Sequence, residues 1–182
     1  MKGNRAAVAA VVVVILVIVG WWMFRRANPA AHVDLIAQFE SATKKPAGSV
    51  SSIVDADLNG ERKKAIATIP PTRFIWKVRV PEDGWLSVSV GVQPEAWTQE
   101  GDGIYFKAGV SDGRAYEDLF TQHLNPFVNK GDRRWIPVMV DLSAYSGEEV
   151  EVIFNTLSGP TGLSTDYRAD MALWGAPEIV TR

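Results

Sequence analysis

Apolar and polar residues divide the chain into one long apolar run and a larger region of short alternating segments. Residues 6–24 contain no charged, amide or hydroxyl side chain. A helix of these 19 residues would be about 28.5 Å long at a rise of 1.5 Å per residue, which is enough to cross the hydrocarbon core of a bilayer. The pattern predicts a transmembrane anchor within residues 1–26.

The length of the run, 19 residues, favours a retained anchor over a cleaved secretory signal, whose apolar core is normally about 7–15 residues long. Basic side chains and the amino terminus precede the run with a one-charge excess over those that follow, so we expect the N-terminus in the cytoplasm and the C-terminal domain outside. The expected membrane-interface residues are Trp21, Trp22, Arg25 and Arg26. Ala6 and Ala10 have the spacing of a helix-packing contact.

Residues 27–51 are predicted to form a short helix and a linker. Leu35, Ile36 and Phe39 recur at helical intervals, and the small polar residues 41–52 contain Pro46 and Gly48. We therefore expect an amphipathic helix near residues 33–39, packed on the following domain, and then a linker.

From residue 52 onward the pattern changes to strands. Phe74, Trp76, Val78 and Val80 alternate with polar residues, and a turn at residues 81–84 leads into a second strand at 85–92. Further strands are expected at 104–110, 117–121, 134–141 and 148–156, and a last one at 172–174 or 178–180. About eight short strands predict a mainly β domain, an antiparallel β-sandwich or jelly roll over residues 52–182.

Composition narrows the chemistry of this domain. The chain has no cysteine, which excludes disulfides and thiolate sites. Four of its 19 basic residues flank the apolar run, which leaves 15 against 21 acidic residues and disfavours nucleic acid as a partner. The densest charge run, residues 61–64, is interpreted as a solvated turn.

One segment has a recognisable corner between two strands. In WIPVMVDLSAYSGEEVEVIFNT, residues 135–156, the carboxylate of Asp141 can accept a hydrogen bond from the amide of Ser143 or Ala144. Together with ADMALWGAPEI, residues 169–179, and PEAWTQEGDGIYFKAGV, residues 94–110, this segment resembles the galactose-binding-like and carbohydrate-binding-module-like jelly-roll domains of bacterial extracytoplasmic proteins. The resemblance implies a sandwich fold, and a family that often binds sugars or serves as an interaction module.

Aromatic side chains are the natural contacts for such a ligand or for a protein partner. Four tryptophans at strand positions are expected in the core: Trp76, Trp85, Trp135 and Trp174. The candidate contacts are Trp97, the most loop-like tryptophan, and Tyr105, Tyr116 and Tyr167. The resemblance also implies a structural calcium ion, for which the candidate ligands are Asp102, Asp166 and Asp170, and no other cofactor is expected.

Catalysis has little support in the sequence. His32 and His123 lack metal-ligand spacing, and no serine lies in a nucleophile elbow. We therefore expect a non-catalytic protein whose sandwich is an interaction module, an accessory subunit that stabilises a larger membrane complex of respiratory or photosynthetic type. The alternative hypothesis is a carbohydrate-binding module anchored in the cell envelope.

Overall fold

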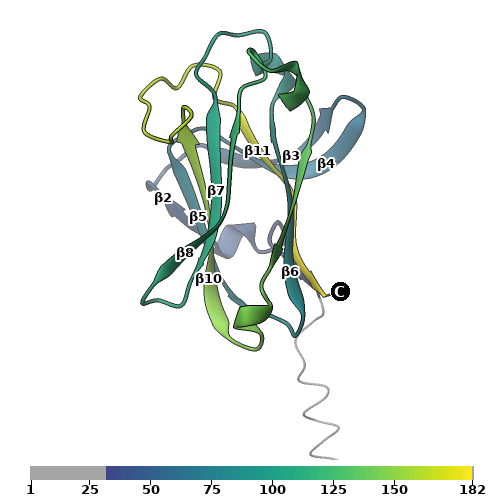
Figure 1. The fold of residues 1–182 in the computed structure, drawn as a ribbon, viewed down its shortest axis with the longest axis vertical. Helices are drawn as coiled ribbons and strands as arrows, with labels where there is room; N and C mark the ends of the chain where they lie inside the picture. The colour runs from purple at the N-terminus through teal and green to yellow at the C-terminus, as the bar shows by residue number, and fades with distance from the viewer. Residues whose placement is uncertain (1–31, 182) are drawn as a thin grey trace, which may run out of the picture. The chain divides into compact units, whose positions relative to one another are not determined.

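Alternating apolar side chains fold the strands into two antiparallel sheets that pack face to face (Figure 1). The computed structural model describes residues 32–181. The predicted β-sandwich is confirmed. No helix among the described residues is long and apolar enough to cross a membrane. The predicted anchor, with Ala6, Ala10, Trp21, Trp22, Arg25 and Arg26, lies outside the described residues.

The first sheet has six strands. Its order is β3-β4-β11-β6-β9, and β1 also pairs with β11. The bounds are β1 His32–Asp34, β3 Ser51–Leu58, β4 Glu61–Thr68, β6 Gly84–Val92, β9 Ile136–Asp141 and β11 Ala172–Thr181. Both segments expected for the last strand, 172–174 and 178–180, belong to β11. The pairing of β11 with β6 has a register shift between Gly175 and Glu178.

The second sheet has five strands in the order β2-β5-β10-β7-β8. The bounds are β2 Thr43–Lys45, β5 Thr72–Arg79, β7 Ile104–Ser111, β8 Tyr116–Leu124 and β10 Glu149–Ser158. Single 3₁₀ turns lie at Phe39–Ser41, Pro94–Ala96, Lys130–Asp132 and Ser143–Tyr145. The Asp141 corner is confirmed, because its Oδ1 accepts the amide hydrogen bond of Ser143 at 2.8 Å.

Aromatic rings fill the space between the sheets. Trp174 is fully buried, stacks on Phe154 at a centroid distance of 4.3 Å, and meets the ring of Phe106 edge-on at 5.1 Å. Trp76 meets the ring of Phe154 edge-on at a centroid distance of 5.1 Å. Trp76, Trp135 and Trp174 are buried as expected, whereas Trp85 is only half-buried.

The helix expected near residues 33–39 is wrong. Residues 32–34 form β1, and the carboxylate of Asp34 then accepts hydrogen bonds from the amides of Ile36 and Ala37, which closes a turn. The apolar spacing has a different cause: Leu35 and Phe39 are buried in the sandwich core from this turn and the 3₁₀ turn after it.

The linker and the charged turn also need correction. Part of the predicted linker is β2, which pairs with β5, and β3 already begins at Ser51. The turn lies at Asn59-Gly60, where both residues have positive φ, and residues 61–64 belong to β4. Asn-Gly is a typical two-residue hairpin turn, so this signal was present in the sequence.

Candidate functional site

A tyrosine ring lies on the outer face of the five-stranded sheet. In β7 the side chains of Phe106, Ala108 and Val110 are buried in the core, so Gly109 faces outward. A Cβ atom on Gly109 would lie 2.6 Å from both Cζ and Oη of Tyr116. The missing side chain therefore lets the Tyr116 ring lie against the sheet, where the residue remains 42% exposed.

Polar groups surround this ring. Asn155 of β10 lies opposite Lys107 of β7 in the sheet and is only 4% exposed. Nζ of Lys107 is 2.8 Å from Oδ2 of Asp118 and 5.4 Å from the centroid of the Tyr116 ring. We call Gly109, Tyr116, Asn155, Lys107 and Asp118 the outer-face site.

The ionisation of the site follows from these contacts. Burial raises the pKa of Tyr116, and hydrogen bonding to the carboxylate of Asp118 raises it further, so the phenol stays protonated. Burial opposes ionisation of Asp118, but hydrogen bonds from Lys107 and Tyr116 outweigh it and lower its pKa. At neutral pH the site therefore presents a neutral ring, an amide and a closed ion pair.

A hollow of about 160 Å³ lies on the same sheet. Its lining includes Ser111, the residue opposite Tyr116, together with Lys77 and Glu151 of the neighbouring strands. An exposed aromatic face beside fixed hydrogen-bonding groups can hold a hydroxyl-bearing ring by one of its C–H faces, because C–H groups pack on the negative face of the π system.

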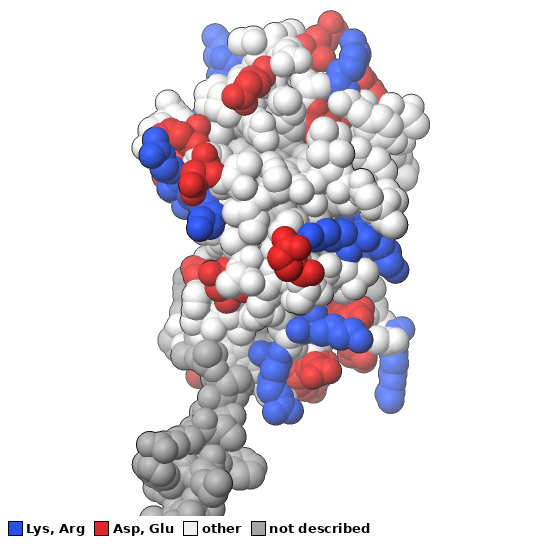
Figure 2. All heavy atoms as spheres, turned by 180° about the vertical axis from the view of Figure 1, so that it is seen from behind, with Lys and Arg blue, Asp and Glu red and all other residues white. Residues whose placement is uncertain are grey.

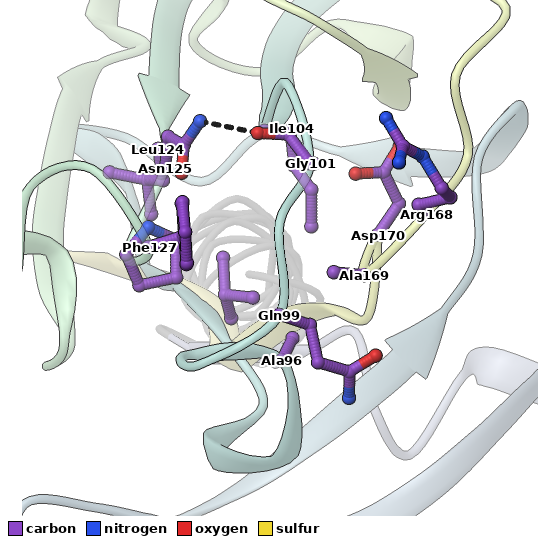
Figure 3. A pocket seen from close by; sticks show the side chains of 13 residues that line it. Ala96, Gln99, Gly101, Ile104, Leu124, Asn125, Phe127, Arg168, Ala169 and Asp170 are labelled. Carbon is purple, nitrogen blue, oxygen red and sulfur yellow. Dashed lines mark hydrogen bonds between the residues drawn. The ribbon is translucent and has the colours of Figure 1, made fainter.

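A second pocket lies among the loops at one end of the sandwich (Figure 3). It is lined by residues of the β6–β7 and β8–β9 loops and by Arg168, Ala169 and Asp170. Asn125 closes one side by donating a hydrogen bond from Nδ2 to the carbonyl of Gly101 at 2.9 Å. Its volume of about 10 Å³ is room for about one water molecule, which is too little for a sugar ring.

The three aspartates proposed for calcium are only partly brought together. Asp102 and Asp170 each have a buried Oδ1 without a hydrogen-bond partner, whereas Asp166 forms an ion pair with Arg168 at 2.7 Å that lowers its pKa to about 2. Within residues 32–181 no group of three histidine, cysteine or acidic side chains could hold a metal ion. The two orphaned oxygens could contribute to such a site, but calcium would need further main-chain or water ligands.

Asp170 also predicts an unusual pH dependence of stability. Burial raises its pKa to about 6, against the opposing hydrogen bond from Ser158, so the folded state holds its proton more tightly than the unfolded state does. The contribution of Asp170 to the free energy of unfolding should therefore fall by on the order of 2–3 kcal/mol as the pH rises from about 4 to about 7.

The variant D170N isolates this effect, because an amide stays neutral over the whole range. Carboxylates with lowered pKa, such as Asp118 and Asp141, act in the opposite direction in both proteins and cancel in the comparison. Urea denaturation should show D170N gaining stability relative to the wild type between pH 4 and pH 7. A difference that is the same at both pH values would contradict the prediction.

The four predicted aromatic contacts lie on different surfaces. Trp97 is half-buried against the small cluster around Trp135, and its Nε1 donates to the carbonyl of Val92 at 2.8 Å. Tyr167 is 47% exposed in the loop before β11. Tyr105 and Tyr116 both lie on the outer face of the five-stranded sheet, but Tyr105 pairs with His123 and Tyr116 with Ser111, at opposite ends of β7, so they share a face without forming one site.

Sequence reasoning missed the partners of Tyr116. Gly109, Asn155 and Asp118 lie far apart in the chain and meet only through the registers of β7, β8 and β10. Strand alternation places Lys107 and Gly109 on one face of their strand, but it does not identify the neighbouring strands. His32 and His123 are also apart: His32 contacts Glu178, and His123 contacts the main-chain oxygen of Asp102.

Comparison with known proteins places this fold. No known family model matches the chain. An uncharacterised protein from Archaeoglobus fulgidus is 36% identical over 104 residues, which are 57% of this chain and 25% of that protein. The chain thus spans about a quarter of the length of this relative.

Solved structures of carbohydrate-binding modules (CBMs) share the fold. The CBM51-2 and INT domains of Clostridium perfringens ZmpB, in complex with GlcNAc, align with a TM-score of 0.57 and 14% identity over 82% of this chain and 31% of that chain. The CBM51 of C. perfringens GH95 in complex with methyl-galactose aligns with a TM-score of 0.52 and 16% identity, over 82% of this chain and 99% of that chain. TmCBM61 in complex with β-1,4-galactotriose aligns with a TM-score of 0.52 and 11% identity, over 86% of this chain and 97% of that chain. The domain therefore shares the two-sheet β-sandwich fold of these carbohydrate-binding modules.

Proposed function

We propose that this chain is a non-catalytic carbohydrate-binding protein whose outer-face site holds a sugar ring on Tyr116. The observation that carries the proposal is the Tyr116 ring lying over Gly109, beside the nearly buried amide of Asn155. The ring supplies a flat apolar surface, the Lys107–Asp118 pair supplies hydrogen bonds to hydroxyl groups, and Asn155 fixes the polar side of the site. The loop-end pocket is too small for this role.

The comparisons support this hypothesis better than the accessory-subunit hypothesis. Two of the solved relatives hold galactose or a galactoside and one holds GlcNAc, all on the same fold. Nothing in the described residues favours a membrane complex. We keep the predicted anchor as part of the proposal, so that the domain binds glycans outside the cell while the apolar run at residues 6–24 attaches it to the membrane.

The test is glycan binding by the Tyr116→Ala variant. The wild type should bind members of a panel that contains GlcNAc, methyl-galactose and β-1,4-galactotriose at millimolar concentration or below. Tyr116→Ala should weaken binding at least about tenfold, because it removes the stacking surface while the residue's exposure limits the cost to folding. Isothermal titration calorimetry measures the affinity, and circular dichroism checks the fold.

Tyr167→Ala is the matched control, since Tyr167 is similarly exposed but lies in the loop before β11. It should leave the affinity unchanged. Equal loss in both variants, or loss only in Tyr167→Ala, would move the site to the loop end. If the wild type bound no glycan of the panel or of a broad array, the proposed function would be wrong.

A further inference from the structure

Cations on the outer face of the five-stranded sheet are mostly balanced by nearby carboxylates. On β5, Lys77 lies opposite Glu151 and Arg79 lies opposite Glu149 of β10. On β7, Lys107 forms its ion pair with Asp118. Opposite charges across an antiparallel pair stabilise a sheet, so these rows are compensated within the fold.

Within the described part of the chain, the cations opposite each other on β2 and β5 have no such carboxylate partner, and we call them the basic row. Arg73 of β5 lies opposite Lys45 of β2 on one side and opposite Asn155 of β10 on the other. In residues 32–181 no carboxylate lies within 4 Å of either cation; Arg73 instead donates from Nε to Oδ1 of Asn155 at 2.6 Å. Like charges directly opposite each other destabilise a sheet. This row therefore holds two uncompensated positive charges.

Figure 2 shows lysine and arginine side chains along one side of the domain with acidic side chains among them. The basic row of Arg73 and Lys45 is therefore distinguished by its partners in the sheet and not by a large basic patch. Asn155 joins this basic row to the outer-face site, because its Oδ1 accepts the hydrogen bond of Arg73 and the residue lies opposite Lys107 in the sheet. An anionic group bound at Arg73 would thus lie next to a ring stacked on Tyr116.

We propose that Arg73 and Lys45 bind the carboxylate of a uronic acid unit in a glycan whose neighbouring ring, or the same ring, stacks on Tyr116. The inference rests on the proposed function and names its ligand class. With Nε used by Asn155, the two terminal nitrogens of Arg73 remain for a carboxylate, which guanidinium groups bind in a planar, bidentate manner. Lys45 is exposed and adds a second positive charge without fixed geometry.

The test compares acidic and neutral trisaccharides of similar size. Trigalacturonate should bind at least about tenfold more tightly than β-1,4-galactotriose at low salt, and the difference should shrink when the ionic strength is raised. Lys45→Gln, which changes no residue of the outer-face site, should weaken this preference while keeping the affinity for the neutral trisaccharide, and the double variant Arg73→Gln and Lys45→Gln should abolish the preference. The charge-matched control is the double variant Arg62→Gln and Lys64→Gln, which removes two exposed cations from β4 of the other sheet and should keep the preference.

The outcomes separate the two proposals. Equal affinity for the acidic and neutral trisaccharides would overturn the uronate inference and leave carbohydrate binding intact. Tighter binding of a sulfated galactotriose than of trigalacturonate would overturn the carboxylate assignment. A preference that survives in the double variant of Arg73 and Lys45 would overturn the role of these two residues. Absence of all glycan binding would overturn the proposed function itself.

Discussion

Replacement of Trp174 by alanine is expected to lower the free energy of unfolding by about 4 kcal/mol. Trp174 is fully buried, stacks on Phe154 and contacts Phe106, so the variant leaves a cavity between the two sheets. It also removes the hydrogen bond from Nε1 of Trp174 to Oγ1 of Thr156, at 2.9 Å, and leaves that buried hydroxyl without this donor. Chemical denaturation monitored by circular dichroism measures the loss.

A milder variant separates the two contributions and remains informative if Trp174→Ala does not fold. Trp174→Phe keeps an aromatic ring in the stack but loses the indole N–H, so it should cost less, about 1–3 kcal/mol. If both variants left the free energy of unfolding within about 0.5 kcal/mol of the wild type, Trp174 would not be a central packing residue of the sandwich.

Gly109→Ala is expected to weaken glycan binding at least about tenfold by displacing the ring of Tyr116. The added Cβ would lie 2.6 Å from atoms of that ring and 2.3 Å from the main-chain oxygen of Glu117, so the ring and the local strand must shift. Overpacking of this kind typically costs about 1–3 kcal/mol of stability as well. Calorimetric titration and thermal denaturation measure the two effects.

Gly131→Ala is the matched control. A Cβ there would meet only the side chain of Asn129, whose nearest atom is Oδ1 at 3.1 Å, and Gly131 lies in the 3₁₀ turn before β9. It should leave glycan affinity unchanged. Unchanged affinity in Gly109→Ala as well would show that the position of the Tyr116 ring does not matter for binding.

The β-sandwich could be predicted from the sequence because the signals for its strands and turns are local. Alternation along a strand such as residues 74–80 identifies the buried face without knowledge of its neighbours, and the corner at Asp141 is a contact between residues two apart. The prediction for residues 33–45 is wrong because it also used only local information. Its apolar spacing fits a helix, but Leu35 and Phe39 are buried from a turn and from a 3₁₀ segment, which only tertiary packing specifies.

The candidate site was harder to predict because it depends on strand order. Tyr116 is one of four predicted aromatic contacts, and nothing local in the sequence distinguishes it from Tyr167 or Trp97. Its role follows from Gly109 beneath it and Asn155 beside it, and these residues become neighbours only when β7 pairs with both β8 and β10. The uncompensated charge of Arg73 is equally invisible in the sequence, since it depends on Lys45 being its partner across β2 and β5.

The most direct test of the central claim, that the outer face of the five-stranded sheet binds glycans, is an NMR titration of the ¹⁵N-labelled domain with trigalacturonate and with β-1,4-galactotriose. We predict that amide shift changes concentrate at Gly109, Tyr116 and Asn155 and at the neighbouring residues of β7, β8 and β10. Shift changes confined to the loop end around Phe127 and Arg168, or no change up to about 10 mM of either sugar, would contradict the account.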